Sequence, residues 1–579
     1  MEYQWFYKNR ENNNKVKTLA DALNISLINA RLLVQRDIYT YEDAKKYFRP
    51  SLNDLHDPFL MKGMGLAVER LTKAVSNNQN ILIYGDYDVD GTTSVALMYS
   101  FLRNISQKID YYVPDREAEG YGISFKGIDY AKSTNCDLVI ALDCGIKANE
   151  KIDYANKLGI DFIICDHHLP GKELPKALAI LDPKQSECTY PDKDLSGCGV
   201  GFKLAQAFAQ KNNIPKEDTY ALLDLVTVSI ASDIVPVVGE NRILAFHGLK
   251  ILNKNPRVGL QNLIQIAEIQ DKEIDINDLV FKIGPKINAA GRLKTAKYSV
   301  DLLIEQDFAK AKENAKELNS INSERKEIDA TITEEALKTI KESKELISRK
   351  TTVLCNSNWH KGVVGIVASR MMEHYYRPTI ILTESNGILT GSARSVRNFN
   401  IYEAIDSCSD LLEGYGGHMY AAGLNLKKEN FEAFNKRFET YVSDKITNDQ
   451  LIPIIEVDQK INIDDIDRKF YNIIKQMSPF GPGNMRPVFV LDKLKDSGYS
   501  KIVGKDKSHL KISVKQDNFA DILNGIAFSK AYFYPKMEKN KAFSACFNLG
   551  INEFRGKQNI EMEVKDLQVC CEDTGKTSN

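Results

Sequence analysis

Four apolar stretches in the first two hundred residues each run directly into an acidic residue. They are ILIYGDYDVDG (81–91), LVIALDCG (138–145), FIICDHH (162–168) and ALAILDP (177–183). Short runs rich in Val, Ile and Leu, bounded by turn residues and separated by helical stretches, predict buried parallel strands of an α/β sheet. Ligands of such sheets bind at the carboxyl ends of the strands, so the residues after these strands are expected to meet at one site.

The side chains expected at that site are mostly carboxylates. They are Asp86, Asp88, Asp90, Asp143, Asp166, His167 and His168. So many carboxylates repel one another unless cations lie among them. The sequence therefore predicts a metal site.

Bulk properties limit the class of protein. A chain of 579 residues is too long for one core and predicts about three or four domains. With 77 basic and 78 acidic residues, global charge gives no support for nucleic-acid binding, which would need a local basic lining. There is no signal peptide and no apolar run near the ~18 residues of a membrane helix, so we expect a cytoplasmic enzyme without a membrane partner. The scattered cysteines predict reduced thiols.

Changes of pattern along the chain predict six segments. A helical N-terminal segment (1–70) is expected to pack on the parallel-sheet domain (71–306). Residues 307–350 lack Pro and Gly and carry an apolar residue every three or four positions, which predicts a long helix, either continuous or with one break. It either lies along one domain or connects two lobes, and we favour the connection. A smaller α/β domain (351–448), a β-rich domain of barrel or sandwich type (449–569) and a disordered tail (570–579) follow.

The sequence Asp86-Tyr87-Asp88-Val89-Asp90-Gly91 places carboxylates at alternate positions after a strand. Alternate residues of an extended segment share a face, so at least two can bind one ion or a pair of ions. A solvated acidic loop and a calcium loop are the alternatives. A calcium loop of the EF-hand type requires a later bidentate Glu and a helix on each side, whereas a buried strand precedes this segment. A catalytic metal site is favoured.

The triplet Asp166-His167-His168 adds imidazole ligands to the carboxylates. Mixed Asp and His ligation suits Mn²⁺, with Mg²⁺ and Zn²⁺ as alternatives. Two such ions can hold the attacking and leaving oxygens of a phosphoryl displacement and lower the pKa of a bound water. Because the chain has no convincing Ser or Cys nucleophile motif, we expect hydrolysis of a phosphate ester or anhydride.

Arginines and glycines elsewhere suggest how the substrate is held. Each of the segments PDREAEGYG, KINAAGRL, GSARS and GGH is by itself typical of a surface loop. Together they favour a polyanionic substrate, because arginine side chains and glycine-rich backbone are the usual means of binding phosphate. The candidate residues are Arg116, Asn288, Arg292, Ser392, Arg394, Gly417 and His418.

With these motifs the chain resembles the DHH superfamily of phosphoesterases and, within it, the RecJ family of bacterial single-strand-specific exonucleases. The resemblance rests on GDYDVDG, ALDCG, CDHH, ASD (231–233), INAAGR, HKGVVGIVASR, GSARS and YGGHMYAAG, in the family's order over nearly the whole chain. It implies an α/β fold with a parallel-sheet DHH domain, a connecting helix, a smaller α/β DHHA1 domain and a C-terminal OB-like β-barrel. It also implies 5′→3′ degradation of single-stranded DNA to mononucleotides in recombinational repair, with two Mn²⁺ or Mg²⁺ ions.

The resemblance also implies a role for each matching position. The metal ligands would be Asp88, Asp90, Asp143, His167 and Asp233; Asp86, His168 and His418 would assist the reaction; and Arg116, Asn288, Arg292, Ser392, Arg394 and Gly417 would hold DNA phosphates. The OB-like domain would guide the strand by stacking, with Phe480, Phe489 or Tyr532 as candidates. The partners would be single-stranded DNA with a 5′ end, a single-strand-binding protein and a RecQ-type helicase.

Two alternatives stay open. The first is another DHH phosphoesterase acting on short oligonucleotides, cyclic dinucleotides or pyrophosphate, although such chains are shorter and lack INAAGR, the long helix and the β-rich domain. The second is a non-catalytic scaffold that binds single strands, although a scaffold would have lost the carboxylates. For the exonuclease, two lobes enclosing a channel above the metal site are expected to exclude duplex DNA.

Overall fold

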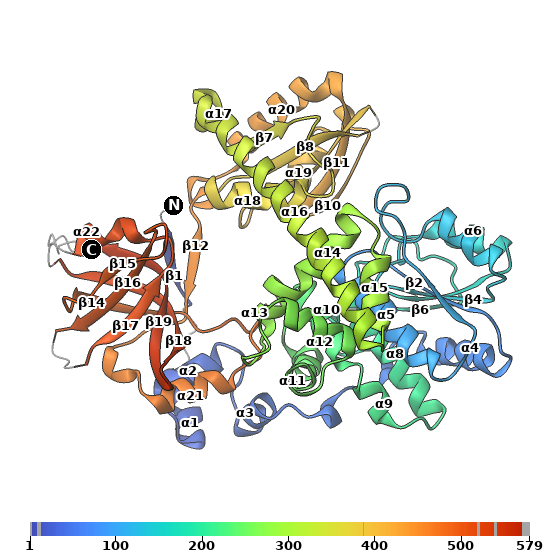
Figure 1. Cartoon of the computed structure of the whole chain (residues 1–579), viewed down its shortest axis with the longest axis horizontal. Coiled ribbons are helices and arrows are strands. Elements are labelled where there is room, and N and C mark those ends of the chain that lie inside the picture. Colours follow the sequence, from blue (N-terminus) through green and yellow to red (C-terminus); the bar gives the residue numbers. More distant parts are fainter. Residues whose placement is uncertain (1–2, 9–12, 386, 518–520, 538–540, 570–579) are drawn as a thin grey trace. The chain divides into compact units, whose positions relative to one another are not determined.

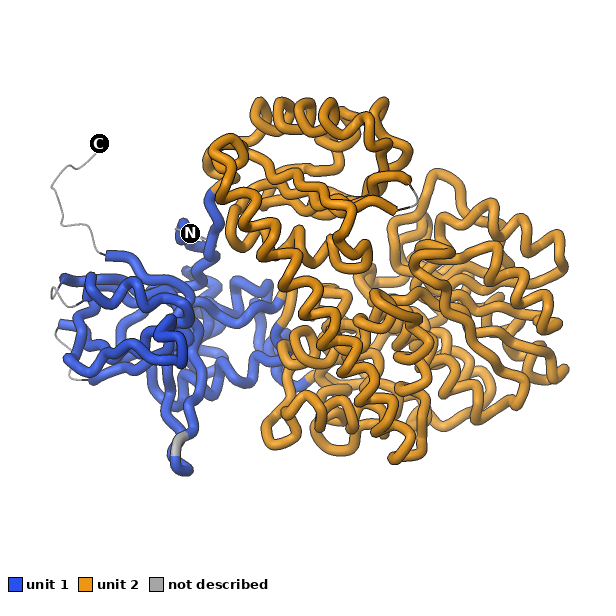
Figure 2. Tube along the Cα trace, turned by 45° about the horizontal axis from the view of Figure 1, so that its top comes forward, with its two compact units in different colours: residues 1–49, 452–480, 484–579 blue, residues 50–451, 481–483 orange. Residues whose placement is uncertain are grey.

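The computed structural model describes residues 3–8, 13–385, 387–517, 521–537 and 541–569 (Figure 1). The chain forms two compact units (Figure 2). The smaller comprises residues 1–49, 452–480 and 484–579, and the larger comprises residues 50–451 and 481–483. The predicted tail, 570–579, lies outside the described residues. Within those residues, no helix has the length and apolar character needed to cross a membrane.

The first lobe of the larger unit (residues 50–306) contains a five-stranded parallel sheet in the order β3-β2-β4-β5-β6. The strands are β2 (Ile81–Gly85), β3 (Ile109–Tyr112), β4 (Leu138–Leu142), β5 (Asp161–Cys165) and β6 (Ala179–Leu181). The four predicted strands are thus confirmed as parallel neighbours. The edge strand β3 was not predicted, because its residues are mostly only half-buried and give no long apolar run.

Helices cover both faces of this sheet, since alternate strand residues point to opposite sides. One core contains Ile83 and Ile140, and the opposite core contains Leu82 and Val139. The first core is closed by α4 (Met64–Ser76), α5 (Val89–Arg103), α8 (Gly197–Lys211) and α10 (Leu223–Ser232), and the second by α6 (Phe125–Ser133) and α7 (Asn149–Lys157). The lobe also contains α9 (Lys216–Tyr220), α11 (Gly239–Lys254), α12 (Val258–Ile266), α13 (Ile276–Asp278), α14 (Gly284–Leu293) and α15 (Lys297–Ile304).

A single helix, α16 (Phe308–Glu342), connects the first lobe to the second, as predicted (Figure 1). At 1.5 Å per residue it is about 50 Å long. Ala315 and Leu318 in its first half belong to the core of the first lobe, whereas Ala336 and Ile340 belong to a core of the second. Ser343 ends α16 and caps the short α17 (Lys344–Ser348), so the predicted segment 307–350 is two helices.

The second lobe (residues 344–451) has a mixed sheet in the order β10-β11-β9-β8-β7. Only β7 and β8 pair in parallel, and β8 to β11 are antiparallel. The strands are β7 (Thr352–Cys355), β8 (Thr379–Ser385), β9 (Ile388–Arg394), β10 (Gly414–His418) and β11 (Ala421–Lys427). The helices are α18 (Val364–His374), α19 (Ile401–Asp406) and α20 (Phe431–Lys445).

The smaller unit contains a seven-stranded β-sheet in the order β13-β14-β18-β19-β17-β16-β15, closed by pairing of β14 with β16. Its strands are β13 (Gln459–Lys460), β14 (Phe489–Asp496), β15 (Lys501–Val503), β16 (His509–Gln516), β17 (Leu523–Ala527), β18 (Phe543–Phe554) and β19 (Lys557–Val569), and its short helices are α21 (Arg468–Gln476) and α22 (Tyr534–Met537). This closure gives the predicted barrel.

The N-terminal segment departs from its prediction. Strand β1 (Gln4–Tyr7) pairs with β12 (Ile454–Val457), and α1 (Asn13–Leu23), α2 (Leu27–Val34) and α3 (Tyr41–Phe48) belong to the smaller unit. Leu19 and Leu33 are buried in the barrel's core, so residues up to 49 belong to the smaller unit, whereas the prediction assigned the whole segment 1–70 to the parallel-sheet domain. The apolar face of each helix was readable from the sequence, but the domain that covers it was not.

The three aromatic residues predicted to stack on DNA lie in different environments. Phe489 is fully buried in the barrel core and cannot stack on a base, so that prediction is wrong. Phe480 packs partly buried against the same core. Tyr532 is 58% exposed, and its role stays a prediction.

Candidate active site

The carboxylates of the DYDVDG segment lie where β2 passes into α5. The Asp88 side chain caps α5 by accepting a hydrogen bond from the Gly91 amide (2.9 Å), and Asp90 lies in the first helical turn. A Cβ on Gly91 would lie 2.4 Å from the carbonyl oxygen of Asp86, so glycine is required for this close passage. The segment therefore places acidic groups at a helix N-terminus, where the helix dipole favours negative charge.

The Asp90 carboxylate is fixed by hydrogen bonds from two other helices. At the start of α8, the Gly197 amide donates to Oδ2 (2.7 Å) and the Cys198 amide to Oδ1 (2.8 Å). The Ser229 hydroxyl of α10 donates to Oδ1 (2.7 Å). A Cβ on Gly197 would lie 2.6 Å from that of Asp143, so glycine is what lets α8 approach both carboxylates.

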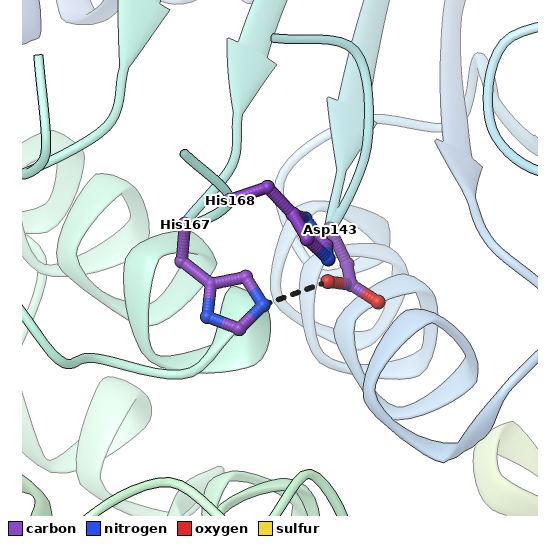
Figure 3. A group of neighbouring side chains, drawn as sticks. All are labelled: Asp143, His167 and His168. Carbon is purple, nitrogen blue, oxygen red and sulfur yellow. Dashed lines mark ion pairs between the residues drawn. The ribbon is translucent and has the colours of Figure 1, made fainter. Parts of the chain in front are cut away.

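His167 lies at the centre of the cluster. Its Nε2 is 3.2 Å from Asp143 Oδ1 (Figure 3). The same nitrogen is 3.6 Å from Asp233 Oδ2 and 3.8 Å from Asp90 Oδ2. Its Nδ1 lies 3.0 Å from the Leu195 carbonyl oxygen. With the ring proton on Nδ1, that carbonyl orients the imidazole and leaves a lone pair on Nε2 facing the carboxylates, as in a metal-binding histidine. Nε2 is buried and has no hydrogen-bond partner.

Asp166 orients the two histidines that follow it. Its Oδ1 accepts a hydrogen bond from the His167 amide (2.8 Å) and lies 2.7 Å from His168 Nδ1. Its Oδ2 accepts a hydrogen bond from the Ile146 amide (2.9 Å). Burial raises the pKa of Asp166, but the hydrogen bond and charge of His168 outweigh it and lower the pKa to about 2. Asp166 is thus a fixed anion that holds the DHH triplet in place.

The surroundings of four other carboxylates disfavour their charged forms and raise their pKa values. Burial, and then the charge of Asp88, raise the pKa of Asp86 to about 8. Burial, and then the charge of Asp90, raise the pKa of Asp233 to about 8 and also raise that of Asp88. The pKa of Asp143 is raised by burial and by Asp90. Cations between these groups would remove the repulsion and restore the charged forms.

Two sets of side chains have the spacing of metal ligands. They are Asp143 with His167 and His168, and Asp90 with His167 and Asp233, and within each set the ligand atoms lie within 4.8 Å of one another. His167 is common to both, and Asp86 and Asp88 are close in the chain to Asp90. The orphaned His167 Nε2 and the unpartnered, buried Oδ2 of Asp86 are open ligand positions. Such an oxygen and nitrogen donor set suits Mn²⁺ or Mg²⁺.

Next to this cluster, a cavity of about 660 Å³ is lined by residues of both lobes. We call it the arginine cavity. Tyr87, Tyr121, Arg116, Arg292, Lys361, Ser392 and Arg394 all line it. Tyr87 lies between Asp86 and Asp88 in the chain. The Tyr121 hydroxyl lies 3.1 Å from the Asp143 carbonyl oxygen and 3.2 Å from His168 Nε2. A ligand in the cavity is therefore within reach of the metal cluster.

The arginines of the cavity are held mainly by backbone carbonyls. Arg116 Nε donates to the Gly291 carbonyl (2.8 Å), and its guanidinium lies 4.1 Å from the centre of the Tyr87 ring. Arg292 donates to the Gly362 carbonyl (3.0 Å). Burial, and then Arg116 and other arginines, lower the pKa of Arg292 to about 10. This crowding of positive charge favours a phosphate in the cavity.

Three predicted phosphate or catalytic residues are not brought to the cavity. Asn288 lies on α14, four residues before Arg292, and its buried Oδ1 has no hydrogen-bond partner. Gly417 and His418 lie at the exposed end of β10. The neighbouring Gly416, rather than either of these, lines the cavity. Their roles stay predictions.

Several residues of the site were not found from the sequence. Ser229 lies one helical turn before Asp233, a spacing that places both on one face of α10 and could have identified it. Tyr121 and Lys361 lie in loops within two segments on which the sequence predictions rest, PDREAEGYG and HKGVVGIVASR, but neither residue was named there. The orienting carbonyl of Leu195 is main chain, which no side-chain pattern reveals.

Comparison with known protein families finds three matches in this chain. The DHH family, N-terminal domain, matches residues 80–230; the DHHA1 domain matches residues 348–444; and the RecJ OB domain matches residues 457–566.

Two relatives are similar along most of their length. The single-stranded-DNA-specific exonuclease RecJ of Bacillus subtilis (strain 168) is 36% identical over 97% of this chain and 70% of the relative. The protein of the same name from Escherichia coli (strain K12) is 33% identical over 88% of this chain and 90% of the relative.

A solved structure has the same fold. The crystal structure of RecJ from Thermus thermophilus in complex with Mn²⁺ matches with a TM-score of 0.84 and 25% identity, covering 98% of this chain and 80% of that one. The Mg²⁺ complex of RecJ from the same organism matches with a TM-score of 0.78 and 23% identity.

Proposed function

This chain belongs to the RecJ family of single-stranded-DNA-specific exonucleases, and we propose that it removes 5′-mononucleotides from the 5′ end of DNA by two-metal hydrolysis. It is a metal-dependent exonuclease that acts on single-stranded DNA with Mn²⁺ or Mg²⁺. The observation that carries the proposal is Tyr121, which lines the arginine cavity while its hydroxyl lies 3.1 Å from the Asp143 carbonyl oxygen and 3.2 Å from His168 Nε2. A phosphate in the cavity would place the next phosphodiester near the ions.

In this proposal the ions are held by Asp88, Asp90, Asp143, His167 and Asp233, with His168 and Asp86 beside them. Bound divalent ions supply Lewis-acid polarisation of the scissile phosphate and an activated water. The chain's own groups do the positioning. Helix α8 and Ser229 fix Asp90, and Asp166 fixes both histidines.

The arginine cavity would hold the 5′-terminal phosphate. Arg116, Arg292 and Arg394 offer guanidinium donors, and Ser392 offers a hydroxyl. A terminal phosphate carries more charge than an internal diester, so a cavity crowded with arginines prefers a chain end. Asn288, Gly417 and His418 are proposed to contact the DNA when it is bound. We also propose that the space between the lobes admits one strand and excludes a duplex.

An assay on end-labelled oligonucleotides tests the proposal. We expect mononucleotides to be released from a 5′-phosphorylated single strand with Mn²⁺ or Mg²⁺, and no product with EDTA. Release from the 3′ end would contradict the polarity, and equal digestion of blunt duplex would contradict the strand selectivity. Faster cleavage of dinucleotides or cyclic dinucleotides than of long strands would favour the alternative of a DHH phosphodiesterase for short substrates.

We further propose that the enzyme acts in recombinational DNA repair in the cytoplasm. A nuclease specific for single strands requires duplex DNA to be unwound first, which supports a helicase of the RecQ type as a partner. Single-strand-binding protein coats exposed single strands, so we propose it as the second partner. Degradation of a blunt duplex only when a helicase is added would support the first partner, and co-purification would test the second.

A further inference from the structure

Ile234 adopts a backbone conformation that does not suit its side chain. It follows Asp233 at the end of α10 and has a φ of 59°. A β-branched residue rarely has positive φ, because its side chain collides with the backbone there. Among the described residues with positive φ, Ile234 is the one β-branched residue. Helices that end with such a residue usually have Gly or Asn at that position.

Hydrogen bonds hold the chain on both sides of Ile234. On one side, the Asp233 amide donates to the Ser229 carbonyl within α10 (2.9 Å). On the other, the Val237 amide donates to the Pro482 carbonyl (2.7 Å), and buried Asn241 donates from Nδ2 to the Pro236 carbonyl (3.1 Å). Strained residues persist where neighbouring contacts over-determine them, often at functional sites. These contacts fix the path of the chain around residue 234, but they do not require an isoleucine there.

Packing does not explain that choice either. Ile234 is 64% exposed, although Val237 nearby is fully buried. The Asp233 side chain is 28% exposed, whereas those of Asp90 and Asp143 are 1% and 3% exposed. Asp233 is therefore the most exposed of these three carboxylates, and the residue next to it in the chain has an exposed aliphatic side chain. A residue that fits neither its conformation nor its burial is best explained by a ligand.

We propose that Ile234 contacts the substrate, packing its side chain against the sugar and base of the nucleotide whose phosphate lies at the metal cluster. This inference rests on the proposed function. Arginines hold the phosphates of a DNA strand, and the deoxyribose and base are the parts that an aliphatic side chain can bury. Ile234 thereby favours a nucleotide chain over a bare phosphate ester.

The test compares Ile234→Asn and Ile234→Gly with Ile234→Val. Asn and Gly suit positive φ but remove the apolar contact, whereas Val keeps most of it. We expect kcat/KM on a 5′-phosphorylated oligonucleotide to fall about tenfold for Asn and Gly and to stay within about threefold of wild type for Val. Affinity for the oligonucleotide in EDTA, measured by fluorescence anisotropy, should fall in the same order. Mn²⁺ affinity should not change, and the unfolding temperature should not fall.

Glu268 gives a matched control. It also has positive φ (56°), follows the end of α12 and is exposed. Glu268→Gly relieves a similar conformation and should leave cleavage and binding unchanged. Wild-type binding and cleavage by Ile234→Asn would overturn the inference, as would a loss of Mn²⁺ affinity that accounts for the lost activity. If wild type does not cleave single strands, the proposed function fails, while binding in EDTA still decides the role of Ile234.

Discussion

The metal cluster and the arginine cavity lie side by side in the larger unit, yet they are built in opposite ways. The carboxylates of the cluster are short side chains from one lobe. They are fixed by amide and hydroxyl donors, as when Gly197, Cys198 and Ser229 hold Asp90. The cavity is lined by long cationic side chains from two lobes, such as Arg116 and Arg394, whose hydrogen-bond partners are mainly carbonyl oxygens.

This difference follows from what each site binds. Divalent ions require ligands at defined distances, so the cluster must be rigid before the ion arrives. A phosphate is a diffuse anion that long side chains can follow, so the cavity tolerates movement. Substitutions should therefore have large effects in the cluster and graded effects in the cavity.

The largest effect is expected for Asp143→Ala. Asp143 is buried and belongs to one of the two ligand sets. Its loss should reduce kcat about 10⁴-fold and weaken Mn²⁺ binding, measured by nuclease assay and calorimetry. Asp153→Ala, at an exposed position of α7, is the control and should behave as wild type. Retained Mn²⁺ affinity in Asp143→Ala would remove Asp143 from the ligand set.

A smaller effect is expected for Arg394→Ala. Arg394 donates to the Ser392 hydroxyl (2.7 Å) in the cavity. Its loss should lower kcat/KM about 10²-fold on 5′-phosphorylated strands and less on 5′-hydroxyl strands, because the terminal phosphate loses a guanidinium. Mn²⁺ affinity should be unchanged, and Arg437→Ala, at an exposed position of α20, should have no effect. An equal loss on both strands would mean that Arg394 does not read the 5′ end.

Ser229→Ala should weaken Mn²⁺ binding about tenfold, because Asp90 loses a donor that fixes its orientation. Ser94 is a matched control, since its hydroxyl is buried and lies 3.5 Å from the same Asp90 oxygen. Ser94→Ala should have a smaller effect. If both variants bind Mn²⁺ as tightly as the wild type does, the main-chain donors of α8 are sufficient to hold Asp90.

The smallest effect is a dependence of stability on pH in metal-free protein. The folded-state pKa of Asp86 and of Asp233 is about 8, above the ~3.9 of an unfolded aspartate. The folded protein therefore binds more protons than the unfolded chain between these values, so its stability falls as pH rises from about 4 to 8. In EDTA the unfolding temperature should drop by a few degrees between pH 6 and 8, and Mn²⁺ should reverse the drop. Arg394→Ala should retain this reversal and Asp143→Ala should lose most of it.

The same contrast governs what could be predicted from sequence. Asp86, Asp143 and His167 follow buried strands, so the topology of a parallel sheet was enough to bring them together. The contacts that fix them depend on tertiary approach: Ser229 reaches Asp90 across more than a hundred residues of chain. No local pattern encodes such a distance.

The sequence also did not show which distant segments pack against each other. The apolar faces of α1 and α2 predicted helices, but nothing in them identified the barrel as their partner. Phe489 shows a second kind of information that the sequence lacked. Its place in a short β-rich run was readable, but the sequence could not show that its side chain points into the barrel.

Helix α16 makes the two lobes thermodynamically interdependent. Ala315 in its first half and Ala336 in its second are fully buried in different cores. Melting either lobe would expose half of the helix and remove support from the other half, so residues 50–451 should unfold in one cooperative transition. An ion bound at the edge of the first sheet would then protect the second lobe from proteolysis, although it touches no residue there.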